Sequence, residues 1–381
     1  MALRPRPSAL RLVPALAAIT LAAAACASSS SSSTTAQPSN GSAGAASGKV
    51  ALLLPETKTT RYEAFDRPYF TAALKQACPN CELSYANADQ DSAKQLQQAQ
   101  AALTNGAKVL VLDPVDGTTA GSIVTQAHAQ GAKVISYDRL ITGGGDKPDY
   151  YLSFDNVKVG ELQATELKKQ LDAAGKKGQL AWINGSPTDN NATLFAQGAH
   201  SVIPKAGADG YTVGYEIATP DWSPDVAQQE MAAAITKLGK ANIVGVYAAN
   251  DGMATGMVTA MQNAGMNPIP PLTGQDAEKA GIQRILAGQQ SMTVYKAIKP
   301  EATNAAELTA DILKGQTPTT VGGLTVQSNA TGTNSIPSIL LTPVAVTKDN
   351  VKDTVIKDGF WKASDVCTGA AATACTQLGI S

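Results

Sequence analysis

Charged and amide side chains follow the apolar strands that we predict along the chain. Asp138 and Arg139 come directly after the strand-forming run KVISY, and Asn250 follows IVGVYAA. Because ligands of open α/β sheets bind at the carboxyl ends of parallel strands, these side chains should face a common crevice. Each sugar hydroxyl donates one hydrogen bond and accepts two, so carboxylate, amide and guanidinium groups can serve adjacent hydroxyls. The pattern predicts a site for a small polyhydroxylated molecule.

Residues of the same chemistry end other predicted strands. They are Arg61 after VALLLP, Asp155 and Asn156 after YYLSF, Asp189 and Asn191 in GSPTDNN, Asp276 in GQDAE and Lys296 after SMTVY. Tyr62 and Trp222 supply rings that could stack on a pyranose. Taken singly, an Asp or Asn at a strand end is most often a turn or helix-capping residue. Trp222 could equally be a loop aromatic, and Lys296 a solvated strand end. Capping alone does not explain the recurrence in both halves of the chain.

Catalytic and cofactor chemistry has little support in the sequence. His128 and His200 are the only histidines, which leaves little room for a catalytic triad or a zinc site. GxSxG, Walker A, GxGxxG and D-x-D-x-D-G motifs are missing from the sequence, so we expect no catalytic residue, no metal and no cofactor. A two-carboxylate glycosidase stays open, because its geometry depends on spatial separation. A net charge of -1 argues against a nucleic-acid partner.

The first 26 residues have the pattern of an export signal. Three arginines precede the apolar run LVPALAAITLAAAA, which is too short for a stable membrane span and ends in small residues. Cys26 follows an imperfect lipoprotein cleavage box, in which Ala23 replaces the usual Leu. We expect lipidation at Cys26; the alternative is ordinary cleavage nearby with an incidental Cys26. Residues 27–48, rich in Ser, Gly and Ala, predict a flexible tether.

The other four cysteines form two local pairs, Cys78 with Cys81 in CPNC and Cys367 with Cys375. In an exported chain, such pairs predict disulfides that close short loops. CPNC could instead be a CxxC redox motif. That interpretation is weaker, because a thioredoxin-like motif starts a helix after a strand, whereas CPNC lies between a predicted helix and a predicted strand.

Short apolar runs alternate with helical stretches from Lys49 onward. Strands at VALLLP, CELSYAN, VLVLDP, KVISYDR and YYLSFDN are separated by predicted helices at 63–77, 92–105 and 118–130, and the rhythm restarts with helices at 159–173, 191–203, 226–239, 255–264 and 279–287. This alternation indicates parallel sheets covered by helices on both faces. Since 381 residues exceed one average domain, we predict an α/β protein with two doubly wound lobes.

Longer strings resemble a known family. KVISYDRLI, YYLSFDNVKVGELQA, GSPTDNNATLF, AANDGMA and GQDAEKAGIQRILAGQQSMTVYK together resemble the periplasmic sugar-binding proteins of bacterial ABC importers, of the ribose and galactose type, and within them the D-xylose-binding branch. The resemblance runs from about Lys49 to about Lys314. It implies the type I periplasmic binding protein fold, in which two α/β lobes joined by a three-segment hinge close on one sugar.

The resemblance also carries the family's sugar contacts onto this chain. They fall on Arg61, Asp138, Arg139, Asp189, Asn191, Trp222, Asn250, Asp276 and Lys296, and all these residue types match. Tyr62 departs from the pattern, because the xylose branch usually has Trp there as a second stacking ring. The expected ligand is therefore D-xylose or a related aldose, and Tyr62 leaves the exact sugar open.

The family's hinge pattern implies the division of the chain. Crossings near 154–157, Lys296 and 321–329 imply a first lobe of residues 49–155 plus 298–322 and a second lobe of residues 156–297 plus 323–365. Residues 1–26 are then a lipoprotein signal peptide, 27–48 the tether, and 366–381 a disulfide-closed extension outside the family pattern.

The implied function is that of a non-enzymatic, extracytoplasmic lipoprotein that delivers a monosaccharide to the transmembrane subunits of an ABC permease. We expect an exported monomer, held at the outer face of the cytoplasmic membrane only by its lipid anchor. A sugar sensor that signals to a membrane receptor would have the same site, and a secreted glycoside hydrolase would reveal itself by cleaving xylo-oligosaccharides. A lactose-repressor-type regulator shares the fold but needs a helix-turn-helix where this chain has an export signal.

Overall fold

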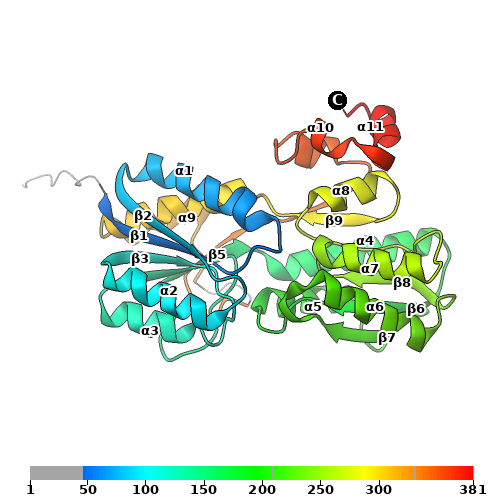
Figure 1. The fold of residues 1–381 in the computed structure, drawn as a ribbon, viewed down its shortest axis with the longest axis horizontal. Helices are drawn as coiled ribbons and strands as arrows, with labels where there is room; N and C mark the ends of the chain where they lie inside the picture. The colour runs from blue at the N-terminus through cyan, green and yellow to red at the C-terminus, as the bar shows by residue number, and fades with distance from the viewer. Residues whose placement is uncertain (1–45, 208, 329–331, 381) are drawn as a thin grey trace, which may run out of the picture. The chain divides into compact units, whose positions relative to one another are not determined.

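The computed structural model describes residues 46–207, 209–328 and 332–380 (Figure 1). The predicted signal peptide, the lipidation at Cys26 and almost all of the tether lie outside the described residues. Within the described ranges, no helix combines the length and the apolar character that crossing a membrane requires.

Six parallel strands form the sheet of the first lobe, in the order β12-β5-β4-β3-β1-β2. Their bounds are β1 (Ser47–Leu54), β2 (Asn80–Asn87), β3 (Ala107–Leu112), β4 (Lys133–Tyr137), β5 (Tyr150–Phe154) and β12 (Ser338–Leu341). Two helix pairs cover the two faces of this sheet, namely α1 (Arg67–Ala77) with α9 (Ile298–Leu313), and α2 (Ser92–Thr104) with α3 (Gly121–Ala129) (Figure 1). The central strands are apolar because both their faces are covered.

The second lobe is built around the parallel sheet β7-β6-β8. Leu272 bridges to Val246 beside β8, and the antiparallel pair β9-β13 continues this side of the lobe. The elements are β6 (Gly178–Asn184), β7 (Tyr211–Ala218), β8 (Ile243–Ala248), β9 (Met292–Tyr295), β13 (Val344–Thr347), α4 (Asn156–Ala173), α5 (Asn190–Val202), α6 (Pro224–Leu238), α7 (Asp251–Asn263) and α8 (Lys279–Leu286). Helix α4 packs against α5, and α6 packs against α7.

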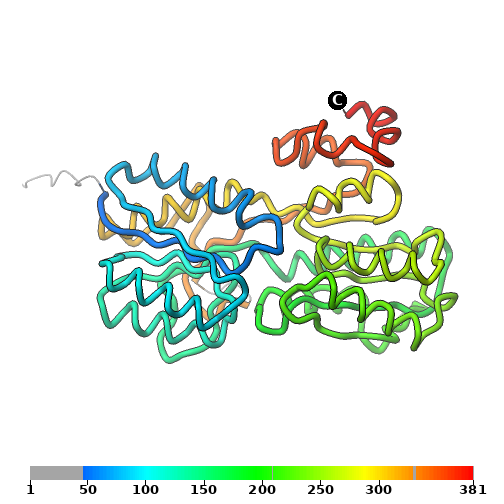
Figure 2. Tube along the Cα trace, viewed as in Figure 1, coloured from blue at the N-terminus to red at the C-terminus, as the bar shows by residue number. Residues whose placement is uncertain are grey.

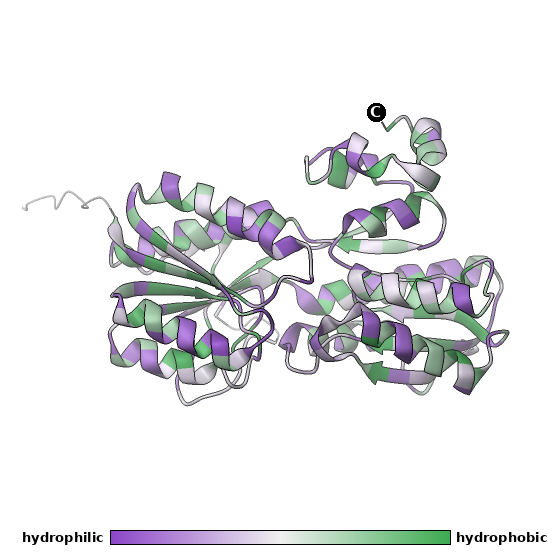
Figure 3. Ribbon diagram, in the orientation of Figure 1, coloured by the Kyte–Doolittle hydropathy of each residue, from purple (hydrophilic) through white to green (hydrophobic). Residues whose placement is uncertain are grey.

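Hydropathy follows these layers. In Figure 3 the strands are predominantly green, whereas the helices mix green with purple. This is the distribution expected when helices shield a buried sheet and face water on their other side. The predicted fold class, two doubly wound parallel-sheet lobes, is confirmed.

The chain passes between the lobes three times, and its path can be followed in Figure 2. The passages lie between β5 and α4, between β9 and α9, and between β12 and β13. The predicted third crossing near 321–329 is wrong. Residues 338–341, which the prediction assigns to the second lobe, form β12 in the sheet of the first lobe. Strand β12 pairs in parallel with β5, with Ser338 opposite Tyr151. Its short apolar run carries no local signal for the sheet that it joins, because that choice depends on tertiary pairing.

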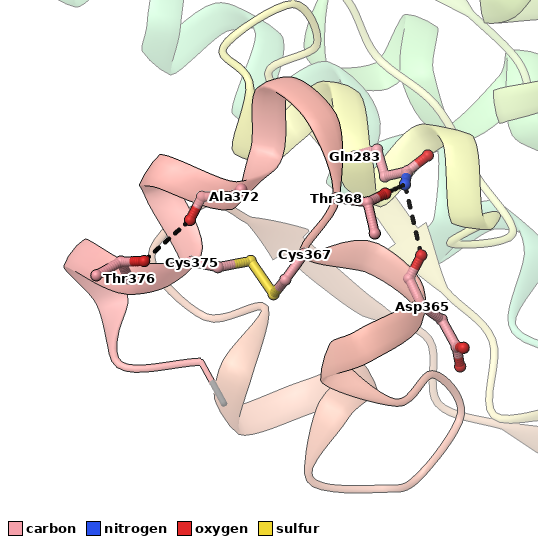
Figure 4. Close-up of a disulfide and its surroundings, with 7 residues drawn as sticks. All are labelled: Gln283, Asp365, Cys367, Thr368, Ala372, Cys375 and Thr376. Atoms are coloured by element: carbon pink, nitrogen blue, oxygen red, sulfur yellow. Dashed lines mark hydrogen bonds between the residues drawn. A yellow bond between two sulfur atoms is a disulfide. The ribbon is translucent and has the colours of Figure 1, made fainter.

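The chain after β13 forms η3 (Lys352–Ile356), α10 (Ala363–Val366), η4 (Gly369–Ala371) and α11 (Ala372–Leu378). Of these elements, α10 and η4 pack on α8, and α11 packs on η4. Figure 4 shows Gln283 of α8 donating to Thr368 Oγ1 at 2.8 Å, close to the Cys367–Cys375 disulfide. Cys78 and Cys81 also form a disulfide, so both predicted pairs are bonded in the structure. CPNC follows the end of α1 and does not start a helix. A thioredoxin-like redox motif lies at the start of a helix, so the redox interpretation does not fit this position.

Candidate functional site

A cavity of about 280 Å³ lies between the carboxyl ends of the strands of the two lobes. All ten predicted ligand-contacting residues line it: Arg61, Tyr62, Asp138, Arg139, Asp189, Asn191, Trp222, Asn250, Asp276 and Lys296. Of the other strand-end candidates, Asp155 is exposed and Asn156 is buried, and neither lines the cavity. The structure therefore brings together residues that are spread over more than half of the chain.

Three lining residues were missed by sequence reasoning, namely Thr59, Phe195 and Gln275. Phe195 lies one helical turn after Asn191 on α5, and the spacing of four residues on one helix face could have identified it. Gln275 immediately precedes Asp276. Thr59 lies in the loop before η1 (Tyr62–Asp66), where no periodic pattern marks it.

Arg61 is the centre of an ion network in the first lobe. Its Nε and Nη2 donate to the two carboxylate oxygens of Asp66 at 2.9 and 2.8 Å. Its Nη1 donates to Asp138 Oδ1 at 2.8 Å, and its Nη2 to Glu301 Oε2 at 2.7 Å. All four side chains are buried. Burial raises the pKa of Asp66 and of Glu301, while the guanidinium charge opposes that rise. The network fixes the fork of Arg61 beside the cavity.

Asp138 is the carboxylate that faces both this network and the cavity. It has a φ of +52°, in the left-handed region, directly after β4. Lys296 Nζ lies 3.4 Å from its Oδ1. Burial raises the pKa of Asp138, but the positive charges of Arg61, Lys296 and Arg139 outweigh burial and hold it below its ordinary value. An ionised Asp138 accepts hydrogen bonds and donates none.

Arg139 connects the two lobes. Its Nη2 donates to the hydroxyl of Tyr62 at 2.9 Å, and its Nε lies 3.1 Å from Asp189 Oδ2 in the second lobe. The same Nε lies 3.5 Å from Asp113 Oδ1, a buried carboxylate after β3 that the sequence analysis did not single out. Burial raises the pKa of Asp113 well above its ordinary value. Although both carboxylates are within ion-pair distance, the Nε–H is aligned with neither of them.

Two second-lobe residues serve as helix caps and also line the cavity. Asp189 accepts from the backbone N–H of Asn191 at 2.9 Å at the start of α5, and Asn250 accepts from that of Met253 at 2.8 Å at the start of α7. The capping interpretation is thus confirmed for both. Because the caps stand at the carboxyl ends of strands, a capping side chain and a cavity-lining side chain can be the same residue.

Trp222 packs closely on the backbone of Gly185. A Cβ added at Gly185 would lie 2.0 Å from the indole, so only glycine fits at this position. The indole Nε1 donates to Asp189 Oδ2 at 3.2 Å. Trp222 and Asp276 have φ values of +54° and +89°. A left-handed backbone conformation at a non-glycine residue costs on the order of 1–3 kcal/mol, and residues with this conformation are found most often at functional sites.

Some buried polar atoms of the lining residues have no hydrogen-bond partner within the described part of the chain. They are Arg139 Nε, Gln275 Oε1 and Asp276 Oδ1. Lys296 Nζ lies 3.5 Å from Asp276 Oδ1, at ion-pair distance only. An unpaired buried polar group costs about 1–3 kcal/mol. The cavity therefore suits a molecule that both donates and accepts hydrogen bonds.

Several known proteins are similar in sequence to this chain over most of its length. Residues 50–317 match the family model described as periplasmic binding protein domain. The D-xylose-binding periplasmic protein of Escherichia coli (strain K12) is 36% identical over 329 residues, which cover 86% of this chain and 95% of that protein. A multiple sugar-binding periplasmic receptor of Rhizobium radiobacter is 33% identical over 339 residues, covering 84% and 93%.

A solved structure agrees with these sequence matches. It is an ABC transporter solute binding protein of Clostridium phytofermentans with bound β-D-glucose. The TM-score is 0.75 at 30% identity, and the match covers 84% of this chain and 99% of that chain.

Proposed function

We propose that this chain, which belongs to the periplasmic binding protein family and to its sugar-binding members that serve ABC importers, binds D-xylose or a closely related aldose. Members of this family are binding components of transport and not enzymes, so the glycosidase alternative is set aside. The sugar is held between the lobes, and the closed form delivers it to the permease.

The observation that carries the proposal is the convergence of ten predicted contacts on one cavity of about 280 Å³. Ionised Asp138 accepts from sugar hydroxyls, the Nε–H of Arg139 donates to them, and Trp222 offers an apolar ring.

The preference for xylose rests on the relative with 36% identity, whose name states D-xylose binding. A relative with 33% identity is named for several sugars, and the structural neighbour holds β-D-glucose. D-glucose differs from D-xylose by one hydroxymethyl group, so the two sugars share all other hydrogen-bonding positions. A comparison of pentoses with hexoses is therefore the decisive specificity test.

Delivery at the membrane is proposed to use a lipid on Cys26, followed by the tether of residues 27–48. Mass spectrometry of the membrane-bound protein should find a diacylglyceryl group on Cys26. Cys26→Ala should release the folded module into the soluble fraction. An unmodified Cys26 in membrane-bound protein would contradict the anchor.

The sugar-binding proposal is tested by a thermal-shift panel of pentoses, hexoses and disaccharides. A ligand that binds only the native state stabilises it by about 2.7 kcal/mol at 100 times its Kd. We expect D-xylose to raise the Tm more than any disaccharide does. If no monosaccharide raises the Tm at millimolar concentration, the proposed function is wrong.

Signalling to a membrane receptor is a second candidate, favoured by the relative that is named a receptor. It requires the same closed form. A deletion strain that still imports xylose but no longer responds to it would support signalling, whereas loss of import supports transport.

A further inference from the structure

Tyr62, which lines the cavity, has an unused hydrogen-bond donor. Its side chain lines the cavity and is 3% exposed. Its hydroxyl oxygen accepts a hydrogen bond from Arg139 Nη2 at 2.9 Å. Among the residues that the structure describes, no acceptor receives the proton of this hydroxyl.

Three tyrosines of the described chain that are at most 1% exposed use this donor. Tyr137 donates to Asp66, Tyr151 to the backbone oxygen of Asp138 at 3.2 Å, and Tyr247 to Gln163 Oε1 at 2.8 Å. Buried hydroxyls normally find such partners, because leaving one unpaired forfeits its hydration without replacement. The unpaired donor of Tyr62 therefore marks a place where the ligand supplies the acceptor.

The surroundings of the ring disfavour a stacking role. The guanidinium carbons of Arg61 and Arg139 lie 5.4 and 5.7 Å from the centroid of the Tyr62 ring. These distances are within the range of cation–π attraction, so both arginines compete with a sugar for the ring. Trp222, on the opposite lobe, has no such cation over its ring among the described residues.

Arg139 also determines which part of the hydroxyl remains available. Its charged N–H occupies a lone pair of the Tyr62 oxygen, and a hydrogen bond accepted from a cation polarises the O–H and strengthens it as a donor. Burial raises the pKa of Tyr62 well above its ordinary value, so the hydroxyl keeps its proton. The group can then give one hydrogen bond and has a fixed direction in which to give it.

We propose that Tyr62 selects the sugar by donating a hydrogen bond to one of its oxygens, and not by stacking on the ring. This inference rests on the proposed function. It makes Tyr62 a specificity-determining contact that requires an acceptor at one position of the aldose.

The test combines Tyr62→Phe with analogues of the aldose that wild type binds best, each lacking one oxygen. Calorimetric titration should show a loss of about tenfold or more for the parent sugar in Tyr62→Phe. One analogue should bind wild type weakly and show no further loss in the variant. Tyr62→Trp supplies a larger ring for stacking but has no hydroxyl at this position, so it should not recover the affinity. Tyr247→Phe, a buried tyrosine outside the cavity, is the matched control and should bind as wild type.

Three outcomes overturn the inference. In the first, Tyr62→Phe retains wild-type affinity. In the second, Tyr62→Trp recovers the affinity. In the third, Tyr62→Phe loses the same factor with every analogue. The last result would mean that Tyr62 only positions Arg139. Thermal melts establish that each variant is folded, and the analogue series on wild type alone must still contain one oxygen whose removal weakens binding. Wild type that binds no sugar would instead overturn the proposed function.

Discussion

The two halves of the cavity are built in different ways. In the first lobe, Arg61 and its buried partners form a network of charges, in which Asp138 and Glu301 come from distant parts of the chain. In the second lobe, Asp189 and Asn250 are held locally as helix caps, and Trp222 is held by packing on glycine. The first half depends on long-range pairing, whereas the second depends on secondary structure that the sequence itself specifies.

This difference predicts where the molecule is fragile. Removing one member of a buried ion network leaves its partners as uncompensated charges, which costs several kcal/mol. Removing a helix cap costs about 1 kcal/mol, because water can replace part of the cap. Mutations of the first half should therefore affect folding and binding together, and mutations of the second half should affect mainly binding.

The largest effect is expected for Arg61→Met. The change leaves Asp66, Glu301 and Asp138 without their shared cation. The free energy of unfolding should fall by about 3–5 kcal/mol in urea titrations followed by circular dichroism. Arg67→Met, at a pair with Glu63 in which the Arg67 side chain is 49% exposed, is the control and should cost about 1 kcal/mol or less. Equal losses in the two variants would refute the network's importance.

Asp138→Asn should reduce sugar affinity by roughly 100-fold, since hydrogen bonds to a charged group contribute about 1.5–3 kcal/mol. The amide keeps the shape of the side chain but loses the charge that Arg61 and Lys296 neutralise. Asp155→Asn is the control, because Asp155 also follows a strand and caps α4 but does not line the cavity. Calorimetric titration that finds wild-type affinity in Asp138→Asn would remove this residue from the site.

Asn250→Ala should separate the cap from the ligand contact. Loss of the cap of α7 should lower the unfolding free energy by about 1 kcal/mol, and loss of the amide should weaken sugar binding by about tenfold. Asp91→Ala removes the cap of α2, which lies away from the cavity. It should cost similar stability and no affinity. If both variants keep wild-type affinity, Asn250 is a cap only.

The last prediction concerns pH. Glu278 of the second lobe lies near Asp251, Asp276 and Arg284, and the backbone N–H of Thr60 from the first lobe points to it. Burial, the strongest influence, raises the pKa of Glu278 to about 8 from an ordinary 4.5. The folded state is stabilised when Glu278 is protonated. This contribution to the unfolding free energy is fully present below the ordinary pKa of Glu278 and is lost as the pH rises through about 8.

If opening the lobes exposes Glu278, closure takes up a proton in this pH window. Sugar affinity should then fall as the pH rises from about pH 6 to pH 8, and full exposure of Glu278 in the open form would make this fall as large as about 50-fold. Glu278→Gln should bind with an affinity that does not change over this range. An equal pH dependence in wild type and variant would assign the effect to other groups.

The contrast between the two halves of the cavity also separates what the sequence predicts from what it does not. The strand ends, the caps Asp189 and Asn250 and ten of the cavity-lining residues could be predicted, because apolar periodicity and local spacing mark the strand ends and the family resemblance identifies the contacts among them. The supporting carboxylates could not. Glu301 reaches Arg61 across 240 positions of the chain, and no local pattern joins them.

Strand β12 shows the same limit at the level of the fold. Its apolar residues predict a strand. Its partner β5, however, lies nearly 190 positions earlier in the chain, with Tyr151 paired to Ser338. Sheet membership is a tertiary choice that period-two patterning does not encode. For that reason the position of the third crossing was wrong while the two-lobed architecture was right.

The central claim is that both lobes hold one sugar. A crystal structure of the protein grown with D-xylose tests it most directly. We predict a single sugar in the cavity, hydrogen-bonded to Asp138 and Arg139 from the first lobe and to Asn250 and Asp276 from the second, with Trp222 against one face of its ring. A sugar that contacts only one lobe, or that lies outside this cavity, would contradict the account.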